Sequence, residues 1–357
     1  MDTKQNIISQ IEGLKGNIAM FADGFIDEVW ELVDTRSSIE KFTLVDKMTG
    51  FADRIKEVGT GGMGIEITKK RRAFGGFTCN IGCAAASLGV DTVMAGIYGK
   101  GELDPIFKPL EDISQVISLG DPATTHVLEF DDGKILMTDM QAMFDMTWDY
   151  MVNAIGKEAL VALLAKADMI GLGYWSLMPA FDEIMTEMCA AIPEDGKTRR
   201  FFFDFADVRK RDEASLVATL ANLSQLNSRF PMTLSVNEHE ALVIFGLHGQ
   251  TFDDEGMPLA EKTAYVREKI GLEELVIHTP RYAIAATRTE GAIQIPHRFC
   301  EKPVRTAGAG DTFNGGYIAA TLAGLGIEER LYTANAAVSF FLNNGFAPTR
   351  QNLIETI

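Results

Sequence analysis

Short apolar runs alternate with segments of helical periodicity along most of the chain, and this pattern constrains the fold more than any other feature. The apolar runs are predicted to be buried strands, beginning at Asn17, Asp91, Ala167, Arg199, Met232 and Glu274. Helices are predicted between them, over residues 79–88, 148–166, 179–191, 214–226 and 238–245. This alternation predicts an α/β fold with a doubly wound, mainly parallel sheet that helices cover on both faces.

Additional strands are predicted in the N-terminal part of the chain. The string "THVLEFDDGKILMTD" predicts a hairpin with its turn at Asp132-Gly133, because Asp-Gly suits a tight two-residue loop. The string "YAIAATRTEGAIQIPH" predicts a second hairpin, with its turn at Glu290-Gly291. We expect a single domain over residues 1–357, in which segments within residues 17–140 form a small β lid that covers a site.

Charge and hydropathy exclude several classes of partner. The formal net charge of −17 argues against a nucleic-acid partner, and the basic run "KKRR" at residues 69–72 is interpreted as a solvated strand or loop face. No stretch approaches the roughly 18 apolar residues of a membrane span, and the N-terminus lacks a signal-peptide pattern. The four cysteines show no disulfide framework. These features predict a cytoplasmic protein with a small-molecule partner.

The string "VRTAGAGDTFNGGY", from Val304, places two glycines and an acid at the start of a predicted helix. A helix start has unpaired backbone N–H groups and a partial positive charge. Gly308 and Gly310 lack a β-carbon, so the backbone can approach an anion closely. Asp311 can accept a proton from a hydroxyl group beside that anion, which is what phosphoryl transfer to an alcohol needs. The alternative is a tight loop in which Asp311 only caps the helix.

The same string resembles the C-terminal signature of the ribokinase-like (PfkB) carbohydrate kinases, D-T-x-G-A-G-D-x-F-x-G-G. The resemblance implies that Asp311 is the catalytic base and that Gly308, Ala309 and Gly310 form the anion hole, with Thr306 on the nucleotide side. Arg305 departs from the family, which often has an aspartate there that helps to hold a monovalent cation. Because a guanidinium places a fixed positive charge at that point, we expect no potassium requirement.

Two N-terminal strings resemble the parts of this family that bind the sugar. "AFGGFTCNIGCAAASLG" resembles the family's first signature, which implies that Gly75, Gly76 and Asn80 contact sugar hydroxyls. Asn80 as a plain helix cap is the alternative. "ADGFIDEV" resembles the first-strand motif, in which Asp27 binds substrate hydroxyls. Asp23 falls at a variable polar position of that motif, where either a substrate contact or a turn contact is possible.

The string "LSVNEHE" carries an N-x-x-E motif that, by resemblance, organises Mg²⁺ and its waters beside the nucleotide phosphates. Asn237 and Glu240 are the residues implied, and a capping box is the alternative for the same pair. "FFFDFADVRKRD" resembles a family segment on the nucleotide side. Asp204 and Arg209 either serve that side or form a structural ion pair.

The donor-binding loop is where the resemblance is weakest. Pro280 and Arg281 replace the glycine of the family's T-x-G-x-x-G loop, so Arg281 is predicted either to bind phosphate directly or to lie in a diverted loop. Asn335, in the string "NAAVSFFLNNG", is a candidate for the wall of the adenine pocket. The resemblance extends over residues 17–345.

Together these features predict an ATP-dependent kinase that phosphorylates a hydroxyl group of a sugar or a sugar-like compound, with Mg²⁺ as its cofactor and a homodimer formed through the lid. A nucleoside kinase is one alternative, in which the string "MQAMFDMTWDYMV" lines a base pocket. A ligand-binding homologue without catalysis is the other.

Overall fold

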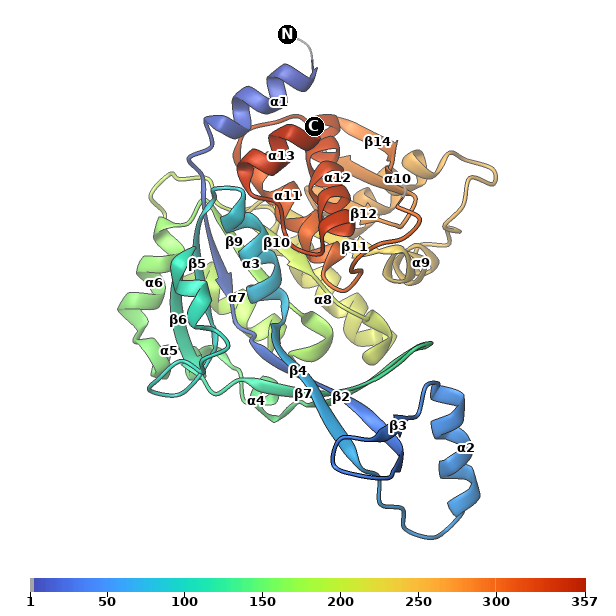
Figure 1. Cartoon of the computed structure of the whole chain (residues 1–357). Coiled ribbons are helices and arrows are strands. Elements are labelled where there is room, and N and C mark those ends of the chain that lie inside the picture. Colours follow the sequence, from blue (N-terminus) through green and yellow to red (C-terminus); the bar gives the residue numbers. More distant parts are fainter. Residues whose placement is uncertain (1–2, 299) are drawn as a thin grey trace.

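A nine-stranded sheet forms the body of the molecule in the computed structural model, which describes residues 3–298 and 300–357 (Figure 1). The strand order is β14 (Gly291–Pro296), β13 (Tyr282–Thr287), β12 (Glu274–His278), β11 (Met232–Asn237), β10 (Arg200–Asp204), β9 (Met169–Gly173), β1 (Asn17–Phe21), β5 (Asp91–Ile97) and β6 (Gln115–Gly120). The strands from β6 to β12 pair in parallel, whereas β13 and β14 pair antiparallel. The predicted strands and the β13–β14 hairpin are confirmed, but the turn of this hairpin spans residues 288–290, because Gly291 already pairs with Thr287.

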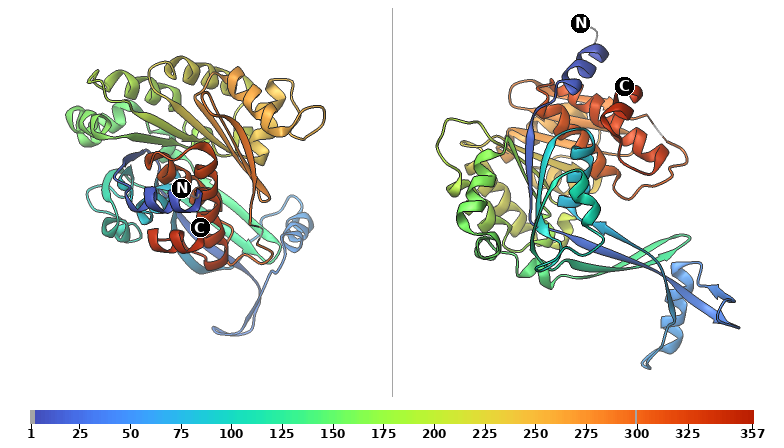
Figure 2. Two further views of the ribbon diagram at one scale, coloured as in Figure 1. Left: turned by 90° about the horizontal axis from the view of Figure 1, so that it is seen from above. Right: turned by 60° about the vertical axis from the view of Figure 1, so that its left-hand side comes forward.

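Helices lie on both sides of this sheet (Figure 2). One face packs against α5 (Trp148–Ile155), α6 (Lys157–Lys166), α7 (Phe181–Ala191), α8 (Glu213–Leu226), α9 (Glu238–Leu247) and α10 (Leu259–Ile270). The other face packs against α1 (Thr3–Glu12), α3 (Phe77–Ser87), α11 (Ala309–Leu322), α12 (Ile327–Asn344) and α13 (Arg350–Thr356).

Side chains alternate between these two faces along the central strands. Phe201 and Phe203 of β10 belong to the core under α5 to α10, whereas Phe202 belongs to the core under α3, α11 and α12. A strand buried on both faces needs apolar residues at every position, which explains the uninterrupted phenylalanine run. The predicted doubly wound α/β fold is confirmed.

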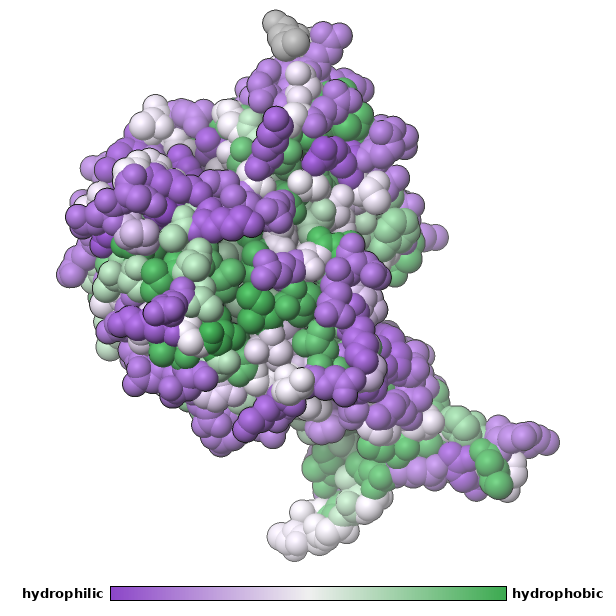
Figure 3. Space-filling model, turned by 90° about the vertical axis from the view of Figure 1, so that its left-hand side faces the viewer, coloured by the Kyte–Doolittle hydropathy of each residue, from purple (hydrophilic) through white to green (hydrophobic). Residues whose placement is uncertain are grey.

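A second, five-stranded sheet forms a lid that stands out from the body (Figures 1 and 3). Its elements are β2 (Phe25–Arg36), β3 (Phe42–Leu44), β4 (Ile67–Gly75), β7 (Ala123–Phe130) and β8 (Gly133–Asp139), with α2 (Met48–Val58) between β3 and β4 and α4 (Gln141–Phe144) leading back to the body. The predicted β7–β8 hairpin is present, but its turn is at Asp131-Asp132, one residue before the predicted position, because Gly133 already pairs with Phe130. The lid has a small core of its own, made by Leu32, Val45, Leu128 and Phe130.

The structure differs from the sequence-based prediction at residues 148–166, where two helices replace one. Gly156 lies between them with φ 85° and ψ 142°, a backbone conformation that favours glycine. The basic run at residues 69–72 lies on β4, where both Lys70 and Arg71 pair with Glu129 of β7, so it is a solvated strand face as expected. Over residues 3–298 and 300–357, we find no helix with the length and hydropathy of a membrane span.

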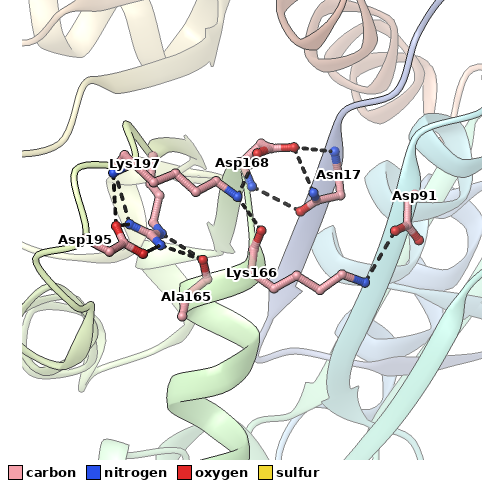
Figure 4. A network of polar contacts seen from close by, with 8 residues as sticks. Asn17, Asp91, Ala165, Lys166, Asp168, Asp195 and Lys197 are labelled. Carbon is pink, nitrogen blue, oxygen red and sulfur yellow. Dashed lines mark hydrogen bonds and ion pairs between the residues drawn. The ribbon is translucent and has the colours of Figure 1, made fainter.

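Charged residues at the edge where the parallel strands begin are tied into a network (Figure 4). Asp168 accepts hydrogen bonds from the backbone and side-chain nitrogens of Asn17, at 3.0 and 2.8 Å, and pairs with Lys197 at 2.8 Å. Asp195 accepts hydrogen bonds from the buried guanidinium of Arg199 at 2.6 and 2.8 Å. The acids that are drawn into this network therefore have cationic partners.

Candidate active site

The opposite edge, where the parallel strands end, carries the residues that the sequence motifs identify. Asp311 lies in the first turn of α11, after Gly308, which has a φ of 91°. The Asp311 carboxylate accepts a hydrogen bond from Asn80 Nδ2 at 2.9 Å and another from the Tyr174 hydroxyl at 3.2 Å. The base predicted from the C-terminal motif is thus joined directly to the predicted sugar-binding asparagine of α3.

The turn before α11 offers backbone donors. The Ala309 amide donates to the carbonyl of Thr306 at 3.0 Å and is therefore occupied. The amides of Gly310 and Asp311 have no backbone partner among the described residues, and the first turn of a helix leaves such groups free to bind an anion. Of the three residues predicted to form the anion hole, Ala309 therefore has an occupied amide, and Asp311 offers a free amide beside that of Gly310.

Helices α3 and α11 pack closely behind this turn. A β-carbon at Gly315 of α11 would collide with Ala84 of α3, so the glycine is needed for the approach of the two helices. This contact places Asn80 and Asp311 at a fixed separation.

Burial raises the pKa of the Asp311 carboxyl to about 6, while the hydrogen bonds from Asn80 and Tyr174 and the charge of Arg305 act in the opposite direction. A carboxyl with this pKa is mostly ionised near neutral pH but is a better proton acceptor than an exposed aspartate. These are the properties of a general base.

Two hollows, an apolar cavity and a polar pocket, meet at Gly310. The apolar cavity has a volume of about 400 Å³ and is lined on its inner side by His278, Phe313, Val338 and Leu342. The polar pocket has a volume of about 280 Å³, and four carboxylates line it: Asp204, Asp207, Glu240 and Asp311. Asn237, His239 and His278 also border both hollows. A ligand with an apolar end and an anionic end would fit this arrangement only with a cation to offset the carboxylates.

Asn237 and Glu240 form a capping box at the start of α9. Asn237 Oδ1 accepts from the Glu240 amide at 3.1 Å, and Glu240 accepts from the Asn237 amide at 2.9 Å and from its Nδ2 at 2.6 Å. Glu240 is only 2% exposed, and burial, followed by the nearby charge of Asp204, raises the pKa of its carboxyl. Asn237 and Glu240 therefore cap α9, as the alternative interpretation proposed, and the same two residues also border the polar pocket.

Asp204 and Arg209 do not form an ion pair with each other, so that alternative is wrong. Asp204 accepts hydrogen bonds from Asn314 Nδ2 at 3.0 Å and from the Ala206 amide at 2.9 Å, whereas Arg209 pairs with Asp207 at 2.7 Å. Burial, aided by the charge of Asp311, raises the pKa of the Asp204 carboxyl. Asp204 and Arg209 both line the polar pocket.

The residues of the polar pocket fit a divalent cation that keeps its waters. Among residues 3–298 and 300–357, no group of three or more His, Cys, Asp or Glu side chains is arranged to hold a metal ion directly. Burial nevertheless raises the pKa values of three of these carboxyls, Asp204, Glu240 and Asp311, whereas Arg209 lowers the pKa of Asp207. Mg²⁺ prefers oxygen ligands and retains several waters. Such an ion would neutralise these carboxylates through water.

The sugar-side residues meet at the base of the lid. Asp27 on β2 lies opposite β4, and a β-carbon at Gly75 would stand 3.1 Å from Asp27 Oδ2. Burial raises the pKa of the Asp27 carboxyl, against the charges of Lys134 and Arg305 and a hydrogen bond from Thr125. The charge of Arg305 also lowers the pKa of the Asp311 carboxyl, so it acts on both carboxylates.

Asp23, a predicted substrate-binding residue, contacts the backbone of α3 instead. Its side chain is 0% exposed and accepts hydrogen bonds from the amides of Phe77 and Thr78 at 2.7 and 2.8 Å. Gly76, with φ 102°, leaves no room for a β-carbon beside Asp23 Oδ2. Asp23 therefore holds the start of α3, and of the two roles left open by the sequence, the backbone contact is the one observed.

Of the residues predicted to bind the nucleotide, some line a hollow next to Asp311 and others do not. Thr306 lines the apolar cavity, whereas Arg281 is exposed and is not among the residues that line it, so the predicted direct phosphate contact finds no support in its position. Asn335 lines an adjoining hollow of about 490 Å³, and both His297 and Arg298 border that hollow as well as the apolar cavity.

Sequence reasoning missed Tyr174, which donates to the base. Its position directly after β9 was a usable signal, since side chains at the ends of parallel strands converge. The methionine-rich string at residues 140–152 contributes to the core instead of a pocket, because Met143, Met146, Trp148 and Met151 are all buried there.

Comparison with known proteins assigns the family. A family model described as prokaryotic ketohexokinase matches residues 2–357. The chain belongs to the prokaryotic ketohexokinase family. Membership makes it a carbohydrate kinase, an enzyme that transfers a phosphoryl group to an alcohol, and confirms the resemblance to ribokinase-like sugar kinases.

Individual relatives agree with this assignment. A ketohexokinase of Haloferax volcanii is 26% identical over 98% of this chain and 92% of its own length. Arabidopsis thaliana ribokinase, solved with ribose and ATP, shares the fold with a TM-score of 0.65 at 18% identity, covering 96% of this chain and 98% of that protein. An Escherichia coli protein assigned as a ribokinase II, solved with ATP and Mg²⁺, gives a TM-score of 0.62 at 13% identity, covering 96% and 98%.

Proposed function

We propose that this member of the prokaryotic ketohexokinase family transfers the γ-phosphoryl group of ATP to a hydroxyl group of a ketohexose, with Asp311 as the base. The observation that carries the proposal is the position of Asp311. It accepts a hydrogen bond from Asn80 of the sugar-side helix and adjoins the polar pocket, at the point where the apolar cavity begins.

The sugar is proposed to lie under the lid, between Asp27, Gly75 and Asn80. An ionised carboxylate accepts hydrogen bonds from adjacent hydroxyl groups, and an amide offers both a donor and an acceptor. Gly75 lets the sugar approach the backbone next to Asp27. This arrangement would hold one hydroxyl group against Asp311.

Asp311 is proposed to take the proton from that hydroxyl group as its oxygen attacks the phosphorus. The proton moves to the carboxylate that Tyr174 and Asn80 orient. The amides of Gly310 and Asp311, together with the dipole of α11, would stabilise the negative charge on the transferred group. Asn237 and Glu240 would order Mg²⁺ through its waters, and the ion supplies further positive charge to the phosphates.

ATP is proposed as the phosphoryl donor because the two hollows suit its two ends. The apolar cavity would receive the base and ribose, and the polar pocket, with Mg²⁺, would receive the phosphates. The Arabidopsis and Escherichia coli relatives that were solved with ATP support this choice.

The test is ADP release by the purified protein with a panel of acceptors: fructose and other ketohexoses, ribose, glucose and nucleosides. We expect fructose or another ketohexose to give the highest kcat/KM. A preference for nucleosides would favour the nucleoside kinase alternative. Binding of a sugar in a thermal-shift assay without any ADP release would indicate a homologue that has lost catalysis.

We also propose that the lid joins two copies of the chain. Strand β8 is a free edge of the lid sheet and exposes Leu136 (55%) and Met137 (47%), and a paired edge is protected from aggregation. Sedimentation velocity at micromolar concentration should show a dimer, and Leu136→Lys should shift it toward monomer. A wild-type monomer at that concentration would exclude the proposed assembly.

A further inference from the structure

His278, the last residue of β12, lies at the junction of the two hollows. It lines both the apolar cavity and the polar pocket. Its ring faces Gly310, where a β-carbon would stand only 2.9 Å from His278 Cε1. The imidazole is therefore immediately beside the turn whose free amides were identified above.

The imidazole is held in place by packing but not by hydrogen bonds. Its ring lies 5.3 Å from the ring of Phe313, measured between centroids. Its Nε2 is buried and has no hydrogen-bond partner among the described residues. Most buried polar atoms in folded proteins have a partner, so an unpartnered nitrogen beside a binding hollow points to a ligand atom that completes it.

The charge state of His278 suits a donor to an oxygen atom. Burial, with a smaller contribution from His297, lowers the pKa of His278 to about 4, so the ring is neutral near pH 7. A neutral imidazole has one N–H donor. Nε2 has no partner among the described residues, whereas a phosphate oxygen at the free amides of Gly310 and Asp311 would accept a hydrogen bond from an N–H at that position.

We infer that His278 donates a hydrogen bond to the polyphosphate of the donor nucleotide, where the chain of phosphates passes from the apolar cavity into the polar pocket. This inference rests on the proposed function in one respect, that a nucleotide occupies these hollows. It gives the donor loop a phosphate contact in place of Arg281, which lies outside the cavity. It also explains why residue 310 is a glycine, since a side chain there would displace the imidazole.

The test compares the binding of ADP and AMP to the wild type, to His278→Leu and to His278→Gln by calorimetry. Loss of one hydrogen bond to a charged group predicts about tenfold weaker ADP binding by His278→Leu. AMP lacks the β-phosphate and should bind with less than a threefold change. His278→Gln retains an N–H donor and should recover part of the ADP affinity. The KM for ATP should rise with the dissociation constant of ADP, while the KM for the sugar stays within about twofold.

His248 provides a matched control. It has a buried Nε2 without a partner and a pKa lowered by burial, but it lines neither hollow. We expect His248→Leu to bind ADP as the wild type does. Melting curves of all variants establish that they are folded, and His278→Gln carries the test if His278→Leu is not.

Two outcomes would overturn the inference. Equal ADP affinity in the wild type and His278→Leu would show that the imidazole does not contact the phosphates, and an equal loss for AMP and ADP would move the contact to the other end of the nucleotide. Either result leaves the proposed kinase activity intact, because wild-type turnover with fructose is measured separately. A wild type that binds no ADP would overturn the proposed function and this inference together.

Discussion

The two edges of the main sheet use the same acidic residue types in opposite ways. At the edge where the parallel strands begin, Asp168 pairs with Lys197 and Asp195 with Arg199, and the Arg199 contact holds the pKa of the Asp195 carboxyl well below its usual range. At the edge where they end, burial raises the pKa of both Asp204 and Asp311. Acids at the first edge are satisfied within the protein and contribute to its stability. Asp204 and Asp311 at the second edge accept hydrogen bonds from neutral donors but have no ion-pair partner among the described residues. This is how a site prepared for a cation and a proton differs from a structural network.

The largest expected effect is on turnover. Asp311→Asn removes the proton acceptor and should lower kcat by about 10²- to 10⁴-fold, while the sugar still raises the melting temperature. Asp168→Asn, at the opposite edge, is the matched control and should leave kcat within about twofold. Steady-state kinetics on both variants distinguish the two edges, and near-normal turnover by Asp311→Asn would exclude its role as base.

A smaller effect is expected at the residue proposed to order Mg²⁺. Glu240→Gln keeps the shape of the side chain but removes its charge, and residues that act through the waters of a metal typically change activity by about 10- to 100-fold. We expect more Mg²⁺ to be needed for half-maximal rate. Asp195→Asn is the control at the other edge. An unchanged Mg²⁺ dependence in Glu240→Gln would contradict this role.

The rate should depend on pH through Asp311. Its pKa is raised to about 6, and only the ionised form accepts a proton, so kcat/KM should fall about tenfold per pH unit below pH 6. The hydrogen bond from Tyr174 lowers this pKa. Tyr174→Phe should therefore move the acid limb of the pH–rate profile to higher pH. A limb that stays in place would show that Tyr174 does not set the pKa of the base.

Substitution in the network at the opposite edge should change stability without changing catalysis. Arg199→Leu leaves the Ala165 carbonyl and the Asp195 carboxylate without their donor and should lower the free energy of unfolding by about 1–3 kcal/mol. Chemical denaturation measures this loss. A clear fall in kcat would mean that the two edges are coupled through the sheet.

The smallest effect on activity is expected when potassium replaces sodium in the buffer. The Arg305 guanidinium lies 5.7 Å from the Phe341 ring centroid and lowers the pKa of Asp311 through its charge. Activity in sodium-only and potassium-only buffers should therefore agree within about twofold. A strong potassium dependence would refute this expectation, and Arg305→Asp is the variant in which such a dependence should appear.

Much of the architecture could be predicted because each buried strand is a local apolar run. The phenylalanines of β10 predict their strand from adjacent residues, and the Asp-Gly signal located the β7–β8 turn to within one residue. The break at Gly156 was missed because a glycine between two helical patterns does not reveal its φ and ψ values.

Asp311 and Asn80 could be identified as candidate site residues because each lies in a local motif at the start of a helix. The role of a side chain was not predictable where its hydrogen-bond partner is remote in sequence and lies outside any recognised motif. The bonds from Asp23 run to amides 54 and 55 positions away, and the hydroxyl of Tyr174 reaches a carboxylate 137 positions away. A local string cannot tell whether a carboxylate faces a ligand or the start of another helix.

The close contact of Gly315 with Ala84 has a consequence for how the enzyme works. Because α3 and α11 are in direct contact there, Asn80 and the proton acceptor Asp311 would be aligned before any substrate arrives. Little rearrangement of the main sheet and its helices would be required during a catalytic cycle. We therefore expect the movements that open and close the site to be confined to the lid. A larger side chain at residue 315 would push α3 and α11 apart and misalign the Asp311 carboxylate. The resulting loss of kcat would persist at saturating sugar concentration.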